Sequence, residues 1–244
     1  MSQFLLFSVM STATVLSLGF FFGLRHATDA DHLAAVSTIV SERKSIWSSM
    51  FIGGVWGLGH TISLVIAGIL VLLLNFQIRN ETAIMLEFFV GVMLFLLGLN
   101  VLRKLFQGGK LHFHTHEHAG RKHVHPHLHE AAKTDEPNTH HGFSFNPRAL
   151  IIGMVHGMAG SAALMFLVIP TIESRPLALL YVVIFGVGSI VGMMLMSLLV
   201  GLPFYFTSKF NRFNHILQCV AGLVSIGLGL MIIYEKGVTE GLFT

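Results

Sequence analysis

Long apolar stretches separated by short polar ones divide this chain into predicted membrane spans. A helix needs about 20 apolar residues to cross ~30 Å of hydrocarbon. Five stretches fit this length, and they cover residues 46–74, 82–105, 147–170, 177–204 and 213–235. The apolar stretch at residues 4–40 is too long for one span, because it would make a helix of about 55 Å. We therefore expect part of it to extend outside the core, to lie in the interface, or to break.

An internal similarity places the first span. Three motifs recur in order at offsets of about 129–131 residues: GLRH (23–26) as GMVH (153–156), VWGLGH (55–60) as IFGVGS (184–189), and VGVMLFLLGL (90–99) as AGLVSIGLGL (221–230). This spacing favours a duplicated unit of three spans, and an odd number of spans inserts the two units in opposite directions. Carrying the fourth span back by that offset puts the first crossing near residues 17–40, with residues 3–16 as an extension.

The composition agrees with a membrane protein. Hydrophobic residues make up 53% of the chain and charged residues only 11%, against about 25% charged in ordinary globular domains. The single cysteine, Cys219, excludes an intramolecular disulfide. We predict an all-α polytopic membrane protein with about six transmembrane helices, arranged as two three-helix repeats of inverted topology. The repeats would cover residues 1–105 and 147–244, with a histidine-rich loop at residues 106–146 between them.

Basic residues in the connections predict the orientation. Most lysines and arginines lie on one side of the predicted membrane, and only Arg79, Arg175 and Lys236 lie on the other. Because Lys and Arg are retained in the cytoplasm, the richer side should be cytoplasmic and both termini should face outward. We therefore expect a multi-pass protein of the cytoplasmic membrane, surrounded by lipid, with its long loop in the cytoplasm. The charges form no stripe that would indicate a nucleic-acid partner.

The long loop holds ten of the fifteen histidines. Their alternation at every second position cannot place them all on one face of a helix, and no apolar stripe accompanies them, so we predict a mobile segment. Neutral imidazoles are ligands for Ni, Co, Zn or Cu. We expect a fluctuating metal sponge or sensor without a defined site, and a merely solvated linker is the alternative. The candidate ligands are His112, His114, His116, His118, His123, His125, His127 and His129.

The stretch RHATDADH (25–32) places polar residues near the middle of the first predicted span. A charged residue at a helix centre costs roughly 2.5–3.5 kcal/mol, so such a cluster persists only if its members pair, ligate or line a cavity. Helical spacing puts His26, Asp29 and His32 on one face, whereas Asp31 points away unless the helix is distorted. A broken helix would gather all four. Two imidazoles and a carboxylate suit a late first-row divalent cation, while the other aspartate orients an imidazole.

An ion pair of the aspartates with Arg25, or a proton relay, is the alternative to metal binding at this stretch. Two further histidines lie deep in predicted spans, His60 in the second and His156 in the fourth. A lone buried histidine is more often a hydrogen-bonded core residue than a ligand. His156, however, aligns with His26 across the repeat, and His60 lies in the same half as the polar stretch. Both therefore join the candidate ligands.

RHATDADH resembles the signature of the nickel/cobalt transporter family, in which a histidine, four residues and then Asp-His mark a metal-transport helix. His26, Asp31 and His32 occupy those positions, and Asp29 matches the usual DADH form. GLGHT (57–61) looks like a second family motif, and MVHGMAGSAAL (154–164) is similar to short six-span relatives that are urease accessory membrane proteins. The histidine-rich loop is similar to that of efflux relatives. The longer permeases of the family have about eight spans, which this chain does not.

These features predict a secondary transporter that takes up Ni²⁺ or Co²⁺ as substrate, with no prosthetic group. The chain has no GxxxxGK[S/T] motif for ATP, and 100 mV of membrane potential supplies about 4.6 kcal/mol for a divalent cation. Export by proton antiport is an alternative. Another is a membrane chaperone that passes nickel to a cytoplasmic nickel chaperone for urease maturation. We do not expect an enzyme, because a di-metal oxidase needs many clustered histidines and only five lie outside the loop.

Overall fold

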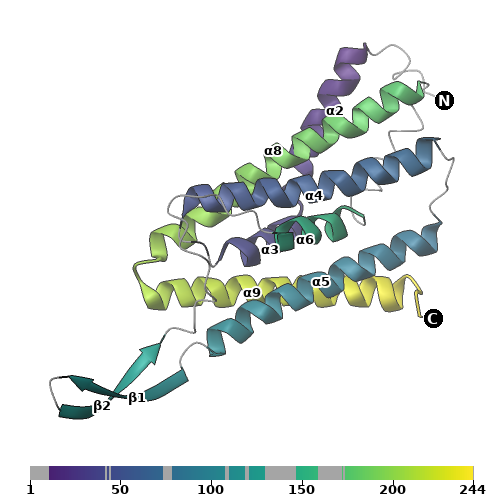
Figure 1. Ribbon diagram of the computed structural model, residues 1–244. Helices are drawn as coiled ribbons and strands as arrows, with labels where there is room; N and C mark the ends of the chain where they lie inside the picture. Colours follow the sequence, from purple (N-terminus) through teal and green to yellow (C-terminus); the bar gives the residue numbers. More distant parts are fainter. Residues whose placement is uncertain are drawn as a thin grey trace.

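The computed structural model describes residues 11–41, 43, 45–73, 79–107, 110–118, 121–129, 147–158, 172 and 174–243. Within these residues the fold is helical except for one β-hairpin (Figure 1). In chain order the elements are α2 (Thr12–His26), α3 (Ala30–Val40), α4 (Ile46–Leu73), α5 (Asn80–Gln107), β1 (Lys110–His118), β2 (Arg121–His129), α6 (Pro147–Gly157), α8 (Arg175–Thr207), α9 (Asn211–Tyr234) and the π-helical turn η2 (Glu235–Thr239).

Helices α4, α5, α8 and α9 are each long and apolar enough to cross a membrane. The shortest are α4 and α5 with 28 residues each, while α9 together with η2 has 29. A helix of 28 residues is about 42 Å long at 1.5 Å per residue. The four helices match the predicted spans at 46–74, 82–105, 177–204 and 213–235. The helical class is therefore confirmed, and four helices of this length and apolarity are compatible with a polytopic membrane protein. The span predicted at 147–170 begins with α6, and its part from residue 159 on lies outside the described residues.

Local chemistry explains where two helices begin and where one ends. The Ser11 side chain accepts a hydrogen bond from the Thr14 backbone N–H at 3.2 Å and caps the start of α2. Pro176 lies in the first turn of α8, where a helix has no use for the missing N–H. Pro203 removes a hydrogen-bond donor from the last turns of α8, and the helix ends at Thr207.

The first predicted span is broken in the structure. Helix α2 ends at His26 and α3 begins at Ala30, after a turn in which the backbone N–H groups of Thr28 and Asp29 donate to Arg25 and His26. Asp29 has extended backbone angles, with φ −63° and ψ 147°, and so begins a new helix. Of the three outcomes expected for the overlong apolar stretch, a break is the one that occurs. Helix α3, with 11 residues, is about 16 Å long and too short to span the hydrocarbon alone.

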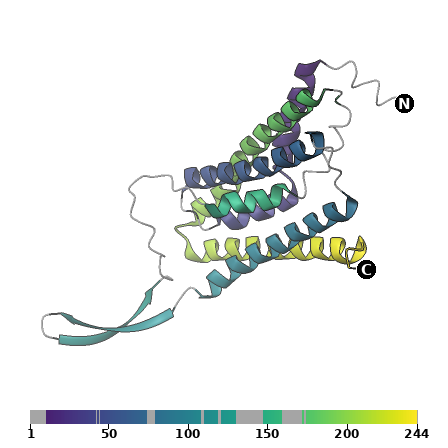
Figure 2. The same cartoon turned by 45° about the vertical axis from the view of Figure 1, so that its right-hand side comes forward.

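The helices pack as two pairs with the short helices between them. Helix α4 runs along α8, and α5 runs along α9. In both views α3 and α6 lie between these pairs (Figures 1 and 2), and α2 packs on α8 as α6 packs on α4. The broken ends of α2 and α3 and the end of α6 therefore meet inside the bundle.

Small residues allow the helices to approach closely, and the close approaches occur in related pairs. A Cβ atom added to Gly23 would overlap the carbonyl oxygen of Phe185, and one added to Gly153 would overlap that of Trp56. These two contacts are related by the offset of about 130 residues that the motifs follow. A second pair of approaches has the same relation and comprises Gly59 with Leu150 and Gly188 with Phe20.

The histidine-rich connection contains two strands, which the sequence analysis did not predict. Strands β1 and β2 form an antiparallel hairpin, in which Lys110 pairs with His129 and His118 pairs with Arg121. Figure 2 shows the hairpin projecting away from the helices. The alternation that excludes a common helix face has the period of a β-strand, so it favours a strand instead. The structure therefore assigns strands to residues 110–118 and 121–129, while the mobility of the connection stays a prediction.

Candidate metal centre

Four histidines from four helices meet where the first span breaks. His26 is the last residue of α2, His32 lies in the first turn of α3, His60 lies in the middle of α4, and His156 lies at the end of α6. Their exposed fractions are 3%, 1%, 0% and 0%. An unbroken helix would have separated His26 and His32 along its axis. The turn between α2 and α3 instead brings their ring centroids to 4.3 Å from each other. The break therefore builds the site.

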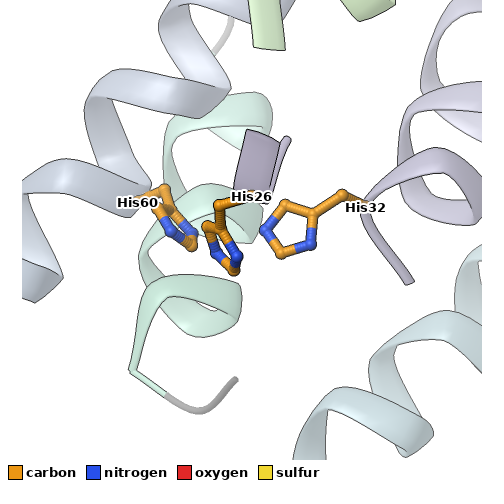
Figure 3. A group of neighbouring side chains, drawn as sticks. All are labelled: His26, His32 and His60. Carbon is orange, nitrogen blue, oxygen red and sulfur yellow. The ribbon is translucent and has the colours of Figure 1, made fainter. Parts of the chain in front are cut away.

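His26, His32 and His60 form one group, which we call the three-histidine cluster (Figure 3). One ring nitrogen from each of them can be chosen so that all three atoms lie within 4.8 Å of one another. The ring of His60 lies 5.2 Å from that of His26 and 5.2 Å from that of His32, between centroids. This arrangement fits imidazole ligands of one transition-metal ion. For zinc, the distance from the metal to an imidazole nitrogen is about 2.0–2.1 Å.

Four of the six ring nitrogens of this cluster lack hydrogen-bond partners in the described part of the chain. Among the described residues, no partner is present for Nε2 of His26, Nε2 of His32, or either ring nitrogen of His60. Buried polar groups are paired in the great majority of cases, and leaving one unpaired costs about 1–3 kcal/mol. Several unpaired nitrogens in one small volume therefore indicate a site for a ligand that accepts their lone pairs.

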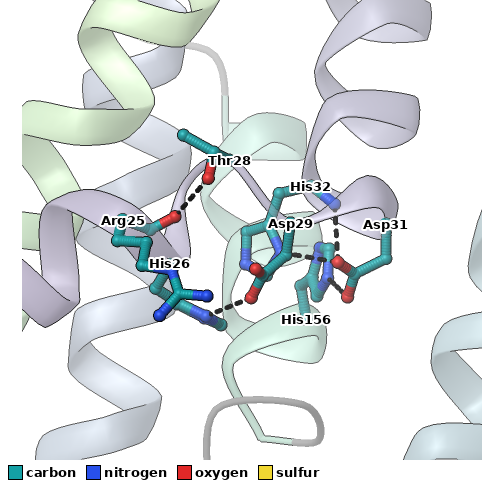
Figure 4. A network of polar contacts seen from close by, with 7 residues as sticks. All are labelled: Arg25, His26, Thr28, Asp29, Asp31, His32 and His156. Atoms are coloured by element: carbon teal, nitrogen blue, oxygen red, sulfur yellow. Dashed lines mark hydrogen bonds and ion pairs between the residues drawn. The ribbon is translucent and has the colours of Figure 1, made fainter.

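Two aspartates contact the histidines (Figure 4). Asp29 Oδ2 accepts a hydrogen bond from His26 Nδ1 at 2.8 Å, and Asp31 Oδ1 accepts one from His32 Nδ1 at 2.9 Å. A carboxylate that holds Nδ1–H leaves Nε2 free as a ligand and fixes the direction of the ring. In this arrangement the aspartates orient the histidines.

A second group of possible ligands shares His32 and comprises Asp31, His32 and His156. Asp31 Oδ2 lies 2.9 Å from His156 Nε2, and the rings of His32 and His156 have centroids 4.0 Å apart. Within the described part of the chain, His156 Nδ1 has no hydrogen-bond partner. The centre therefore extends from the three-histidine cluster to a second position next to it.

One side of the break is open. The side chain of Asp29 is 47% exposed and that of Asp31 is 23% exposed, although the histidines that they contact are buried. Arg25 and Thr28 are also exposed. The exposed side of the break thus carries charged and polar groups, while the histidine rings lie on its buried side.

The structure brings together all six residues proposed from the sequence. The distortion that Asp31 required is present as the break before Ala30, and Asp31 contacts both His32 and His156. Whether these residues bind a metal ion stays a prediction.

Sequence reasoning missed Trp56, whose ring lies 5.5 Å from that of His32 and whose indole N–H is buried without a partner among the described residues. Its place one helical turn before His60 was the available signal.

Comparison with curated proteins relates this chain to a known family. The urease accessory protein UreH of Bacillus sp. (strain TB-90) is 38% identical over 230 residues, which are 94% of this chain and 95% of that protein. The chain belongs to the UreH family of urease accessory proteins. The chloroplast protein FOR GROWTH AND FERTILITY 2 of Arabidopsis thaliana is 27% identical over 226 residues, 89% of this chain and 55% of that protein. No family model and no solved structure matches the chain.

Proposed function

We propose that this protein carries Ni²⁺, or Co²⁺, across the cytoplasmic membrane in the direction of uptake. The observation that carries the proposal is the three-histidine cluster, in which buried ring nitrogens have no partner in the described residues. A cation bound there would satisfy them. Metal handling also accords with the urease accessory family, since urease is a nickel enzyme.

The donor set limits the choice of ion. Imidazole nitrogens suit nickel, cobalt, copper and zinc, whereas Mg²⁺ and Ca²⁺ prefer shells of oxygen atoms. Affinity alone does not select nickel, because copper binds such sites more tightly. The urease accessory family therefore favours nickel among the transition metals, and the imidazole donors disfavour the hard cations.

The open side of the break supplies a path to the cluster. Charged groups at membrane depth are stable only against protein or water, so the exposed Asp29 and Arg25 mark a hydrated face. A hydrated cation would meet the Asp29 carboxylate first. It would then exchange water for the nitrogen of His26, whose ring the same carboxylate holds.

The related close approaches support two repeats of inverted topology, residues 1–105 and 147–244. In such an arrangement α2 on α8 and α6 on α4 are equivalent contacts, and His156 is the counterpart of His26. Ser189, the counterpart of His60, is buried and its Oγ has no partner within the described residues. The candidate ligands are thus unequally divided between the two repeats. Rocking of one repeat against the other would open the site to each side of the membrane in turn.

The membrane potential is sufficient for uptake. A divalent cation gains about 4.6 kcal/mol per 100 mV of inward-negative potential. The Lys/Arg bias favours an orientation with the hairpin side of the bundle in the cytoplasm and the termini outside. Export against this field would require coupling to protons.

A membrane chaperone is the second candidate function. The word accessory in the relative's name favours it, because such a protein would hold nickel at the same histidines and pass it to a cytoplasmic partner. Binding without flux is the behaviour that would identify it. The same experiment therefore tests both functions.

Radiolabelled nickel flux into vesicles that contain only this protein is the decisive measurement. With a negative interior potential we expect accumulation by the wild type and at least a tenfold lower rate for His26→Gln and His60→Gln. His215→Gln is the matched control, because His215 is exposed and lies at the start of α9. Flux that persists in both site variants would refute the site, while nickel binding without flux in the wild type would favour the chaperone.

A further inference from the structure

The two groups of possible ligands are built from different parts of the chain. His26, His32 and His60 of the three-histidine cluster lie on α2, α3 and α4, and thus in the first half of the chain alone. The second group, which we call the bridging position, consists of Asp31, His32 and His156. Since His156 lies at the end of α6, the bridging position joins the two halves of the chain. The cluster can therefore hold an ion without α6, whereas the bridging position cannot.

His32 belongs to both groups and has one ring nitrogen to offer. Its Nδ1 lies 2.9 Å from Asp31 Oδ1, while its Nε2 is buried without a partner among the described residues. Its ring centroid is 5.2 Å from that of His60 and 4.0 Å from that of His156. The rings of His60 and His156 are 6.0 Å apart, and within the described residues these two share no group of possible ligands. His32 is thus the link between the two positions.

Simultaneous occupation of the two positions is unfavourable. Two ions would compete for one imidazole, and two divalent charges a few ångströms apart repel each other strongly. The positions also differ in access, because the carboxylate beside His26 is 47% exposed, whereas the one that contacts His156 is 23% exposed. An ion that enters past Asp29 therefore meets the three-histidine cluster before it meets the bridging position.

We propose that the bridging position is a second, separate binding step, which receives the ion from the three-histidine cluster through His32. This inference rests on the proposed transport function and adds an order of events to it. An ion in the cluster contacts one half of the chain, and after the transfer it contacts both. A ligand shifts a conformational equilibrium only through different affinities for the two states, so the bridging step is the one that can favour one placement of α6 over another. His156 is therefore needed to move the ion on, but not to bind it first.

Trp56 can report ion binding at this centre. It is 1% exposed, and its ring lies 5.5 Å from that of His32 and 5.6 Å from that of His156. Ni²⁺ has a partly filled d shell and quenches the fluorescence of an indole close to it. The chain has two tryptophans, and the other, Trp47, is 66% exposed in the first turn of α4. Trp47→Phe therefore leaves Trp56 as the sole tryptophan, and this variant is the reference protein.

The first test separates binding from flux in the reference protein. His156→Gln should leave the Kd of Ni²⁺, measured by quenching of Trp56, within about threefold, and should lower radiolabelled nickel flux into vesicles at least tenfold. His32→Gln removes the ring that both positions use and should lose both quenching and flux. Flux within about threefold of the reference in His156→Gln, or a Kd at least tenfold weaker, would overturn the proposed transfer.

His60→Gln is the reciprocal variant, and its outcome does not depend on the folding of His156→Gln. It removes a ligand of the cluster alone and leaves Asp31, His32 and His156 in place. We expect saturable quenching to remain, and to weaken at least tenfold in His60→Gln/His156→Gln. Complete loss of quenching in His60→Gln would overturn the transfer, because it would show one binding position instead of two. Absence of flux in the reference protein would instead refute transport itself, whatever the quenching shows.

Discussion

Asp31 and His156 are 125 positions apart in the chain, yet Asp31 Oδ2 lies 2.9 Å from His156 Nε2. This hydrogen bond ties the start of α3 to the end of α6, and the other oxygen of Asp31 holds His32. One carboxylate thus connects a histidine of the three-histidine cluster to the second half of the chain. An ion that binds at the cluster would therefore act on both halves.

The first prediction concerns Asp31. Asp31→Asn should lower nickel affinity 10–100-fold while the protein still folds, because carboxylates that orient metal-binding histidines have effects of this size. Binding of radiolabelled Ni²⁺ to purified protein measures this. Asp29→Asn is the comparison, and it should cost less because the Asp29 side chain is 47% exposed and its contact to His26 is weakened by water. A larger loss from Asp29→Asn would contradict our assignment of the main orienting role to Asp31.

The second prediction concerns the packing of α6 on α4. Gly153→Ala should destabilise the protein by at least about 1–3 kcal/mol, the usual cost of overpacking, because its Cβ would overlap the Trp56 carbonyl oxygen. Thermal unfolding in detergent measures the effect. Gly227→Ala in α9 is the matched control, since no atom lies within 4 Å of the added Cβ among its described surroundings. This control should be neutral or slightly stabilising through helix propensity. Equal melting temperatures for the two variants would show that the close approach does not limit stability.

Much of the candidate site could be predicted from the internal repeat and the polar stretch at residues 25–32. The offset that aligns His156 with His26 placed both near mid-membrane, and the impossibility of putting Asp31 on the shared helix face required a distortion. The structure contains that distortion at residues 27–29. What the sequence could not supply is which atom of each ring faces the cluster. That depends on the hydrogen bonds of Asp29 and Asp31, which only the folded chain defines.

The hairpin was missed for a different reason. The alternation of histidines excludes a common helix face, but Leu111 and Phe113 alternate with them at the period of a strand. The apolar residues between the histidines are few, so the period of two that indicates a strand is weak in this segment. A test for period two would have predicted the strands, but the pairing of His114 with His125 requires the register.

The third prediction concerns the open side of the break. In a Cys219→Ser background, Thr28→Cys should react with a membrane-impermeant thiol reagent, because Thr28 lies on the exposed side with Arg25 and Asp29. Ni²⁺ should slow this reaction by occupying the path. Phe21→Cys is the control, since Phe21 is 62% exposed on the apolar part of α2 and should face lipid. We expect at least a tenfold difference in labelling rate. A Thr28→Cys rate no higher than that of Phe21→Cys would mean that the break is not hydrated.

The fourth prediction concerns stabilisation by the ion. A ligand that binds only the folded state stabilises it by about 2.7 kcal/mol at a hundred times its Kd, so Ni²⁺ should raise the melting temperature of the wild type. His26→Gln/His60→Gln should abolish the part of the increase that comes from the three-histidine cluster, because it removes ring nitrogens that have no other partner within the described residues. The hairpin histidines contribute equally to both proteins, so the difference between them isolates the cluster. Mg²⁺ at the same concentration should stabilise neither protein, since imidazole is a poor ligand for it. An equal Ni²⁺-dependent increase in the wild type and the double variant would place the stabilising ion outside the cluster, and the proposed transport site would then fail.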